Sequence, residues 1–428
     1  MTKKLKVSEN RRYLCETDGT PFFYLGDTAW ELFHRLSMDE CRLYLQDRAN
    51  KGFTVIQAVV LAELEGVATP DAQGNLPLFE GDVTKPNPAY FAHVDAVVDA
   101  AAELGLFIGM LPTWGRYWKS GERNPPLFTE DSAFSYGRWL GERYRNKQVI
   151  WILGGDRVPD GAESLLLSRM AEGLREGDGG EHLITFHPCG PGQSSSHFHE
   201  APWLDFNMNQ SSHAARNHFN GVFIQRDYNL APIKPTLDGE PRYEQVPVGF
   251  YNAGIARSPD RFDDFDVRQC AYWSMMSGAC GHTYGNNNIW QMYDSGRTPI
   301  IDADVPWHEA IHHPGARQMG YLRRLFEACH YETLVPANER LFDAVQAGGG
   351  RTLAMRATDD SLFLVYTPFG EPFGFDLGRQ FSPCRASWFN PKYNTRHAFL
   401  QSSTGSLQTY APPTSGRGND WMLLLEKV

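Results

Sequence analysis

Short runs of consecutive apolar residues alternate with longer amphipathic segments along the first 330 residues. Eight runs have the length and the β-branched and aromatic content of buried strands, and most end in a polar or glycine-rich stretch. They cover residues 22–26, 53–61, 106–112, 149–153, 182–187, 204–210, 235–239 and 279–285. Strands that alternate with helices are typical of repeated βα units, so the pattern predicts an α/β fold.

Helix signals are clear in four of the intervening segments. Ser37 precedes MDECRLYLQDRANK and Gly52 follows it, while Pro88 and Gly105 bracket the next amphipathic segment. SAFSYGRWLGERYRN and DVRQCAYWSMMSG show the same periodicity. The helices between the fifth, sixth and seventh runs are harder to see, because the apolar spacing there is irregular.

Eight strands in about 310 residues predict a closed (β/α)8 TIM barrel with insertions. An open doubly wound sheet is the alternative, but its phosphate-binding GxGxxG turn is replaced by GDTAW after the first run. Near Pro336 the pattern changes to short alternating runs broken by GGG, DD and PFG. We therefore expect a barrel over residues 1–337 and a small all-β sandwich domain over residues 338–428.

The composition limits the class of partner. A formal net charge of −11 argues against nucleic acid or an anionic membrane surface, and a small neutral ligand fits better. Seven scattered cysteines without a CxxC pair predict free thiols. The N-terminus lacks an apolar signal-peptide segment, so we expect a cytoplasmic protein. The oligomeric state is left open.

Polar side chains at the strand ends carry the predicted chemistry, because a TIM barrel places its active site there. The run VIWILGGDRVP ends at Asp156 after two glycines that leave room for a substrate, and TLDGE ends at Glu240. Asp156 has an alternative interpretation as a helix N-cap or a partner of Arg157, and Glu240 as an exposed turn residue. Asp27, Glu63 and Asp238 are the rival carboxylates.

The remaining motifs exclude other chemistries. Two carboxyl groups with amides and aromatic rings are what hydrolysis of a glycoside requires. No GxSxG, HExxH or DxDxDG pattern occurs, so we expect no serine hydrolase elbow, no cofactor and no metal. His187, His197 and His199 on a glycine- and serine-rich loop are weak candidates for metal ligands. The predicted substrate-binding residues are Asp27, Trp114, His187, Asn209, Gln210 and Tyr284.

The segments GDTAW, VIWILGGD, PTLDGEPRYE and YWSMMSGACGHTYGNNNIW resemble the DUF4038 group of apiosidase-like glycoside hydrolases, on which glycoside hydrolase family 140 is built. The region with SWFNPKYN resembles the small β-sandwich named for collagen binding that often follows this domain. The resemblance implies a retaining mechanism with Asp156 as acid/base and Glu240 as nucleophile.

We therefore expect a retaining, exo-acting glycosidase that cleaves a terminal sugar from short oligosaccharides or glycosides. Arg242 or Tyr284 would keep Glu240 ionised, and Arg157 would point away from Asp156. One alternative is a non-catalytic carbohydrate-binding protein on the same scaffold, and another is a metal-dependent isomerase or hydrolase.

Overall fold

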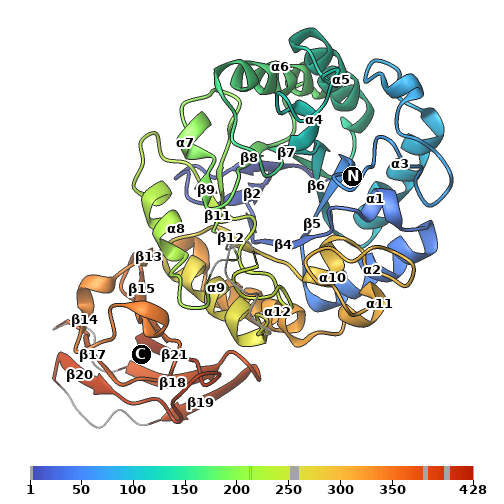
Figure 1. The fold of residues 1–428 in the computed structure, drawn as a ribbon. Coiled ribbons are helices and arrows are strands. Elements are labelled where there is room, and N and C mark those ends of the chain that lie inside the picture. The colour runs from blue at the N-terminus through green and yellow to red at the C-terminus, as the bar shows by residue number, and fades with distance from the viewer. Residues whose placement is uncertain are drawn as a thin grey trace.

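The computed structural model describes residues 3–211, 213, 215–250, 260–378, 384–399 and 405–427. It forms a barrel followed by a smaller all-β domain, which lies to one side of the barrel (Figure 1). Within the described residues, no helix is long and apolar enough to cross a membrane.

The barrel sheet is almost entirely parallel. Its strands are β4 (Tyr24–Thr28), β5 (Val55–Leu61), β6 (Phe107–Thr113), β7 (Val149–Gly154), β8 (Ile184–His187), β10 (Asn207–Gln210), β11 (Thr236–Asp238) and β12 (Gly281–Tyr284), and the short β9 (Gly192–Gln193) pairs antiparallel with β10. The Asp205 N–H donates to Ile184 O at 2.9 Å, which brings the β10 segment against β8. The eight predicted strands and the (β/α)8 fold are confirmed.

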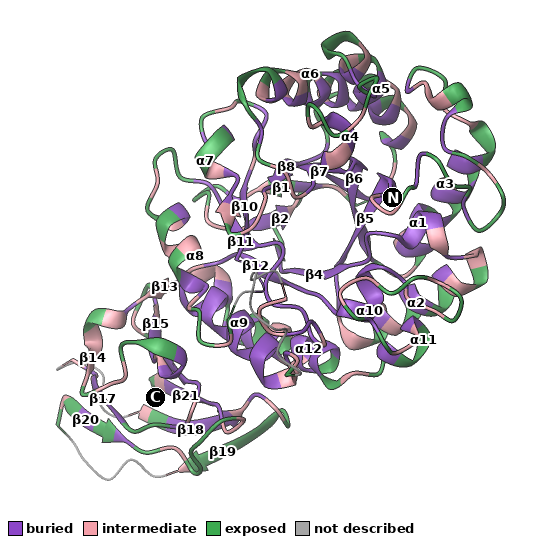
Figure 2. Ribbon diagram, viewed as in Figure 1, coloured by how far each residue is buried: buried purple, intermediate pink, exposed green. Residues whose placement is uncertain are grey.

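Residues of the barrel strands are buried because helices cover the outer face and side chains fill the inside. All seven residues of β5 are buried, and Figure 2 shows the same burial around the whole sheet. This explains why the strands read as continuous apolar runs rather than as alternating ones.

Helices surround the sheet (Figure 1). They are α1 (Leu32–Arg35), α2 (Met38–Lys51), α3 (Pro88–Glu103), α4 (Gly115–Trp118), α5 (Glu130–Tyr144), α6 (Gly161–Asp178), α7 (Ser195–Phe198), α8 (Gly221–Tyr228), α9 (Asp264–Met276), α10 (Asn287–Trp290), α11 (Trp307–Ala310) and α12 (Pro314–Ala328), with 3-10 turns η1 (Phe79–Gly81), η2 (Tyr331–Thr333), η3 (Asn338–Arg340) and η4 (Gly348–Gly350).

The ends of α2 follow the sequence signals. Ser37 and Glu40 form a capping box at its start, and Gly52 takes a left-handed conformation at its end. The helices after β8 and β10 are only 4 and 8 residues long, which is why their periodicity was not visible in the sequence.

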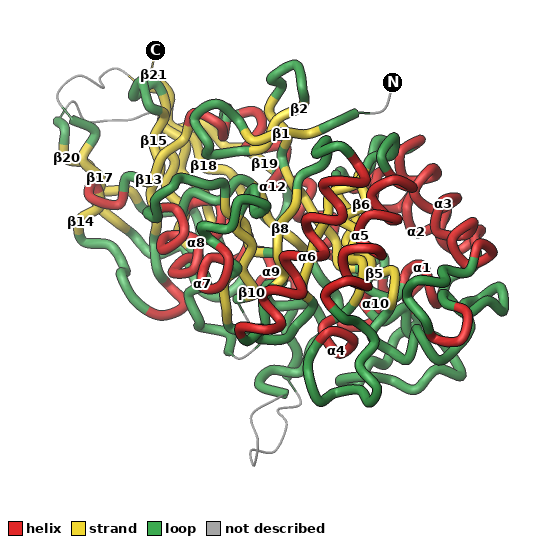
Figure 3. Tube along the Cα trace, turned by 90° about the horizontal axis from the view of Figure 1, so that it is seen from above, coloured by secondary structure: helices red, strands yellow, loops and turns green. Residues whose placement is uncertain are grey.

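A small antiparallel sheet of β1 (Leu5–Val7), β2 (Leu14–Glu16) and β3 (Pro21–Phe22) precedes the barrel. Figure 3 places β1 and β2 on the side of the barrel opposite α4. Hydrogen bonds join this segment to loops that enter the strands: Lys3 N donates to Gln148 Oε1 at 3.3 Å, and Arg11 Nε to Ile233 O at 2.7 Å. This small sheet therefore covers the face of the barrel at which the parallel strands begin. The carboxyl ends of the strands lie at the opposite face.

The C-terminal domain contains two antiparallel sheets. One has the order β13-β15-β16-β21-β18-β19 and the other β14-β17-β20. The strands are β13 (Leu334–Pro336), β14 (Leu341–Phe342), β15 (Leu353–Ala357), β16 (Leu362–Thr367), β17 (Phe373–Asp376), β18 (Cys384–Asn390), β19 (Thr395–Phe399), β20 (Leu407–Tyr410) and β21 (Trp421–Lys427). Side chains such as Phe363, Phe375 and Trp388 form a core between the two sheets, as predicted for a sandwich.

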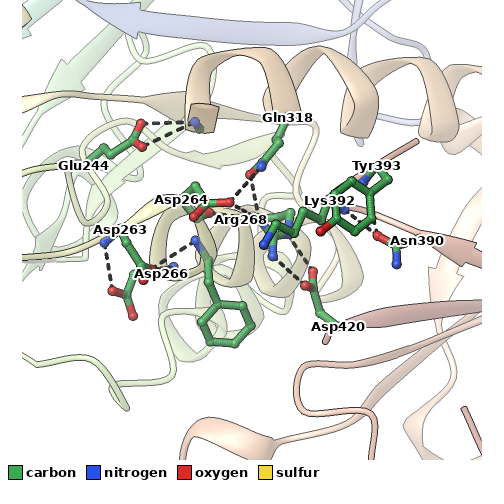
Figure 4. Close-up of polar contacts among 12 residues, drawn as sticks. Glu244, Asp263, Asp264, Asp266, Arg268, Gln318, Asn390, Lys392, Tyr393 and Asp420 are labelled. Atoms are coloured by element: carbon green, nitrogen blue, oxygen red, sulfur yellow. Dashed lines mark hydrogen bonds and ion pairs between the residues drawn. The ribbon is translucent and has the colours of Figure 1, made fainter. Parts of the chain in front are cut away.

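The larger sheet packs its other face against α9 and α12. The rings of Tyr272 on α9 and Tyr366 on β16 stack at 4.8 Å. Arg268 on α9 forms a two-pronged ion pair with Asp420, at 2.8 and 2.6 Å, and also donates to Gln318 on α12 (Figure 4). All three side chains are buried, so the two domains share one continuous core at this contact.

Candidate active site

A pocket of about 450 Å³ lies where the barrel strands end. Its walls come from residues that follow nearly every strand, in agreement with the usual position of a TIM-barrel active site. The lining residues are Trp30, Glu63, Leu64, Trp114, Asp156, Cys189, Gly190, Gln210, His213, Glu240, Tyr243, Val246, Phe250, Trp290, Ile300 and Ile301. Asp156 and Glu240 therefore face the same space.

The end of β7 has an unusual backbone path. Gly154, Gly155 and Asp156 all have positive φ angles, of 100°, 104° and 61°. A Cβ on Gly154 would lie 2.2 Å from His187 O, and one on Gly155 would lie 2.9 Å from the Trp114 ring. The two glycines are thus required by the left-handed path and by protein neighbours. The expectation that they leave space for a substrate is wrong, because His187 and Trp114 fill that space.

Asp156 projects into the pocket from this turn. It does not cap the next helix, since Asp160 is the N-cap of α6. Arg157 binds Glu122 through Nε at 2.5 Å, while its Nη1 lies 4.0 Å from Asp156 Oδ2. Burial and the charge of Glu240 raise the pKa of Asp156, and the opposing effect of Arg157 is smaller. The carboxyl group is therefore kept protonated at higher pH than a free aspartate.

Glu240 lies two residues beyond β11 and is 7% exposed. His187 Nε2 lies 2.9 Å from its Oε2, and His213 Nε2 lies 3.1 Å from its Oε1. Burial alone would raise the pKa of Glu240, but the two histidines outweigh burial and hold the pKa below its usual value. Glu240 is therefore held ionised in a site that it shares with a protonated acid.

The expected supports of Glu240 lie elsewhere. Arg242 is directed away from the pocket, where its Nε contacts Cys270 Sγ at 2.8 Å and its Nη1 donates to Gln269 at 3.1 Å. Tyr284 donates to Glu244 Oε2 at 2.6 Å. The expectation that Arg242 or Tyr284 keeps Glu240 ionised is wrong, because the sequence does not show which side of the strand end each side chain takes.

Asp27 and Tyr284 are two of the four predicted substrate-binding residues that do not line the pocket, and both are bound by other side chains of the protein. Asp27 is fully buried, and its Oδ2 accepts hydrogen bonds from Arg48 and from Tyr44 Oη on α2. Tyr284 is 1% exposed, and its hydroxyl donates a hydrogen bond to Glu244. Both side chains hold the barrel together, and neither is placed to contact a ligand in the pocket.

The other predicted substrate-binding residues gather at or directly below the pocket. Trp114 and Gln210 line it, and Trp114 Nε1 and Gln210 Oε1 have no hydrogen-bond partner within the described part of the chain. His187 lies beneath, and its ring is 5.4 Å from Trp30 and 5.7 Å from Trp114. Asn209 is fully buried with both side-chain polar atoms unpaired in the same described ranges. Flat rings beside unpaired amides suit a sugar face and its hydroxyls.

Of the rival carboxylates, Asp238 has a structural role and Glu63 reaches the pocket. Asn220 Nδ2 donates to Asp238 Oδ2 at 2.9 Å, so Asp238 holds its own loop. Glu63 lines the pocket, and burial together with the nearby charge of Asp156 raises the pKa of its carboxyl to about 8. Three carboxyl groups thus face the pocket, at Glu63, Asp156 and Glu240.

The three candidate metal histidines are not brought together. His187 contacts Glu240, His199 lies 3.3 Å from Asn207 Oδ1, and His197 is exposed. All seven cysteines are free, as predicted. His213 stands among the polar residues after the sixth strand, but sequence reasoning assigned it no role, because its only signal was its position three residues after the end of β10.

Comparison with known proteins identifies the families to which the two domains are similar. The family of apiosidase-like catalytic domains matches residues 8–333, and the family named for the collagen-binding domain of a collagenase matches residues 335–426. No curated protein matches the chain.

Three solved structures are similar over almost the whole chain. One described as a glycoside hydrolase is 31% identical with a TM-score of 0.89, covering 99% of this chain and 97% of its own. A glycoside hydrolase family 5 protein from Bacteroides vulgatus is 30% identical with a TM-score of 0.89, covering 99% and 93%. A further Bacteroides vulgatus structure is 14% identical with a TM-score of 0.68, covering 100% and 82%, and supports the fold alone. The chain belongs to the apiosidase-like family and is a glycoside hydrolase.

Proposed function

We propose that the chain is a retaining, exo-acting glycosidase in which Asp156 is the acid/base and Glu240 the nucleophile. The observation that carries the proposal is the opposite effect of one pocket on two carboxyl groups. The pKa of Asp156 is raised and that of Glu240 is lowered. Such a pair supplies a proton donor and an ionised nucleophile at the same pH.

In the first step, Asp156 donates its proton to the glycosidic oxygen and Glu240 attacks the anomeric carbon, so that the leaving alcohol departs and a glycosyl ester forms on Glu240. In the second step, Asp156, now ionised, takes a proton from water as the water attacks the same carbon. The sugar is released with its original configuration, and both carboxyl groups return to their starting states.

Exo action is supported by the shape of the site. The lining residues follow strands all around the barrel, which favours a pocket for a chain end over a groove for a long polymer. We propose short oligosaccharides or glycosides as substrates, with apiose, arabinose, galactose and glucose as the sugars to compare. A cytoplasmic location stays a prediction from the sequence.

The test is hydrolysis of a panel of aryl glycosides of these sugars by the wild type and by Asp156→Ala, Glu240→Ala and Glu65→Gln. Glu65 is an exposed carboxylate outside the pocket lining and serves as the control. We expect losses of about 1,000-fold or more in kcat for Glu240→Ala and none for Glu65→Gln. Ordinary activity in Glu240→Ala, or binding of sugars without any turnover in the wild type, would refute the proposal.

A further inference from the structure

The pocket wall has a second component that glycosidic bond cleavage does not use. Five of the lining side chains are aliphatic or purely aromatic, at Leu64, Val246, Phe250, Ile300 and Ile301. None of them can donate or accept a hydrogen bond, whereas every hydroxyl of a sugar needs a partner when it leaves water. This part of the wall is therefore poorly suited to a second sugar unit.

The two isoleucines are held in place by buried amides. Asn287 Nδ2 donates to Ile301 O at 2.7 Å, and Gln291 donates to Ile300 O at 2.9 Å and accepts from Ile300 N at 2.8 Å. Both amides are fully buried. Asn287 lies in the NNN run shortly after β12, and its amide fixes the loop that carries the apolar wall.

The backbone at Ile301 is strained. Its φ angle is 49°, in the left-handed region that a β-branched side chain rarely adopts. Such conformations cost free energy and persist only where the surrounding contacts enforce them, most often at ligand sites. The side chain of Ile301 remains partly exposed in the pocket. Core packing alone therefore does not explain why isoleucine occupies this strained position.

We propose that the pocket takes glycosides in which the group beyond the cleaved sugar is apolar, an alkyl or aryl aglycone, and that Ile300 and Ile301 form the wall against which this group lies. The inference rests on the proposed hydrolase function and names its substrate class. Burial of an aglycone here removes apolar surface from water on both partners, and the preformed loop needs little ordering on binding.

Methyl, butyl and hexyl glycosides of the same sugar test the proposal, because their leaving alcohols have similar basicity and differ mainly in apolar surface. We expect kcat/KM of the wild type to rise roughly threefold for each added methylene that is buried. In Ile301→Asn and in Ile300→Asn, tested separately, we expect each added methylene to raise kcat/KM by less than about half of the wild-type factor. Asparagine tolerates a positive φ, so the loop at position 301 keeps its path.

Ile233→Asn is the control for the substitution itself, since Ile233 is exposed and does not line the pocket. Its chain-length series should equal that of the wild type. An equal kcat/KM for all three alkyl glycosides, or an unchanged series in both pocket variants, overturns the proposal and leaves glycoside hydrolysis intact.

Calorimetry on Glu240→Gln separates the two claims, because binding is then measured without turnover. Tighter binding of hexyl than of methyl glycosides supports the apolar site even if the wild type hydrolyses nothing in the panel, in which case the proposed function alone fails. If no sugar of the panel shows a gain from methyl to hexyl in either experiment, the apolar site is refuted.

Discussion

His187 Nε2 lies 2.9 Å from Glu240 Oε2, and the fully buried His187 ring packs beside the rings of Trp30 and Trp114. His213 approaches the other carboxylate oxygen at 3.1 Å. Each carboxylate oxygen of Glu240 thus lies beside one imidazole, and the glutamate stays ionised although it is almost fully buried.

Loss of one imidazole should weaken this effect. In His187→Ala we expect the pKa of Glu240 to rise, so that the acidic limb of the kcat/KM profile moves to higher pH, with a loss of about 100-fold near neutral pH. The pH dependence of kcat/KM measures this directly. His93→Ala changes a buried histidine that does not line the pocket and controls for loss of stability; an unshifted acidic limb in His187→Ala would contradict the assigned role.

Glu63 should make stability depend on pH. Burial and the charge of Asp156 raise the pKa of Glu63 from 4.5 to about 8 in the folded state, so the folded protein holds this proton more tightly than the unfolded chain. The contribution of Glu63 to stability is therefore complete below about pH 4.5 and is lost as the pH rises to about 8.

Glu63→Gln keeps the shape and removes the titration. At pH 8.5 we expect this variant to melt roughly 2–4 °C above the wild type, with little difference at pH 5. Thermal denaturation across this pH range is the measurement, and Glu65→Gln, at an exposed position two residues away, should follow the wild type at both ends. If the melting temperatures of Glu63→Gln and the wild type change with pH in parallel, Glu63 does not titrate in this range.

Gly154 and Gly155, at the end of β7, should not tolerate replacement by a residue with a side chain. In Gly155→Ala the new Cβ would meet the Trp114 ring at 2.9 Å and Gly115 N at 2.8 Å, at a φ of 104°. We expect Asp156 to be displaced and kcat/KM to fall by about 100-fold. Gly161→Ala is the control, because its Cβ would meet nothing within 4 Å; equal activity of the two variants would contradict the role of this turn.

The domain contact should depend on Asp420. Removal of its carboxylate leaves the guanidinium of Arg268 buried, with Gln318 and Asp264 as its remaining side-chain partners among the described residues. We expect Asp420→Ala to lower the free energy of unfolding by about 3–5 kcal/mol. Urea denaturation measures the loss, and Arg138→Ala, which breaks exposed ion pairs with Glu142 and Glu176, should cost less than about 1 kcal/mol. If both variants lowered the free energy of unfolding equally, the buried ion pair would contribute no more to stability than an exposed one.

Local sequence was sufficient for the fold because each βα unit carries its own signals. The buried run VIWILG and the Ser37 capping box act over a few residues, and both formed where they were expected. Asp156 and Glu240 reach one pocket for the same reason, since the ends of parallel barrel strands converge.

Side-chain direction at a strand end depends on distant partners and could not be predicted. Asp27 turns to Arg48 on α2, while His213 turns to Glu240 from a loop with no periodic pattern. The sequence predicted that Gly154 and Gly155 leave space for a ligand. The three-dimensional structure shows that His187 and Trp114 fill this space.

We propose Asp156 as the acid/base and Glu240 as the nucleophile of a retaining glycosidase. Rescue by azide, read by NMR with an aryl glycoside, separates the two roles. Azide should restore turnover of Asp156→Ala through attack on the glycosyl ester and give a glycosyl azide of retained configuration, whereas with Glu240→Ala it should attack the substrate and give the inverted azide. An inverted azide from Asp156→Ala, or a retained one from Glu240→Ala, would contradict the account.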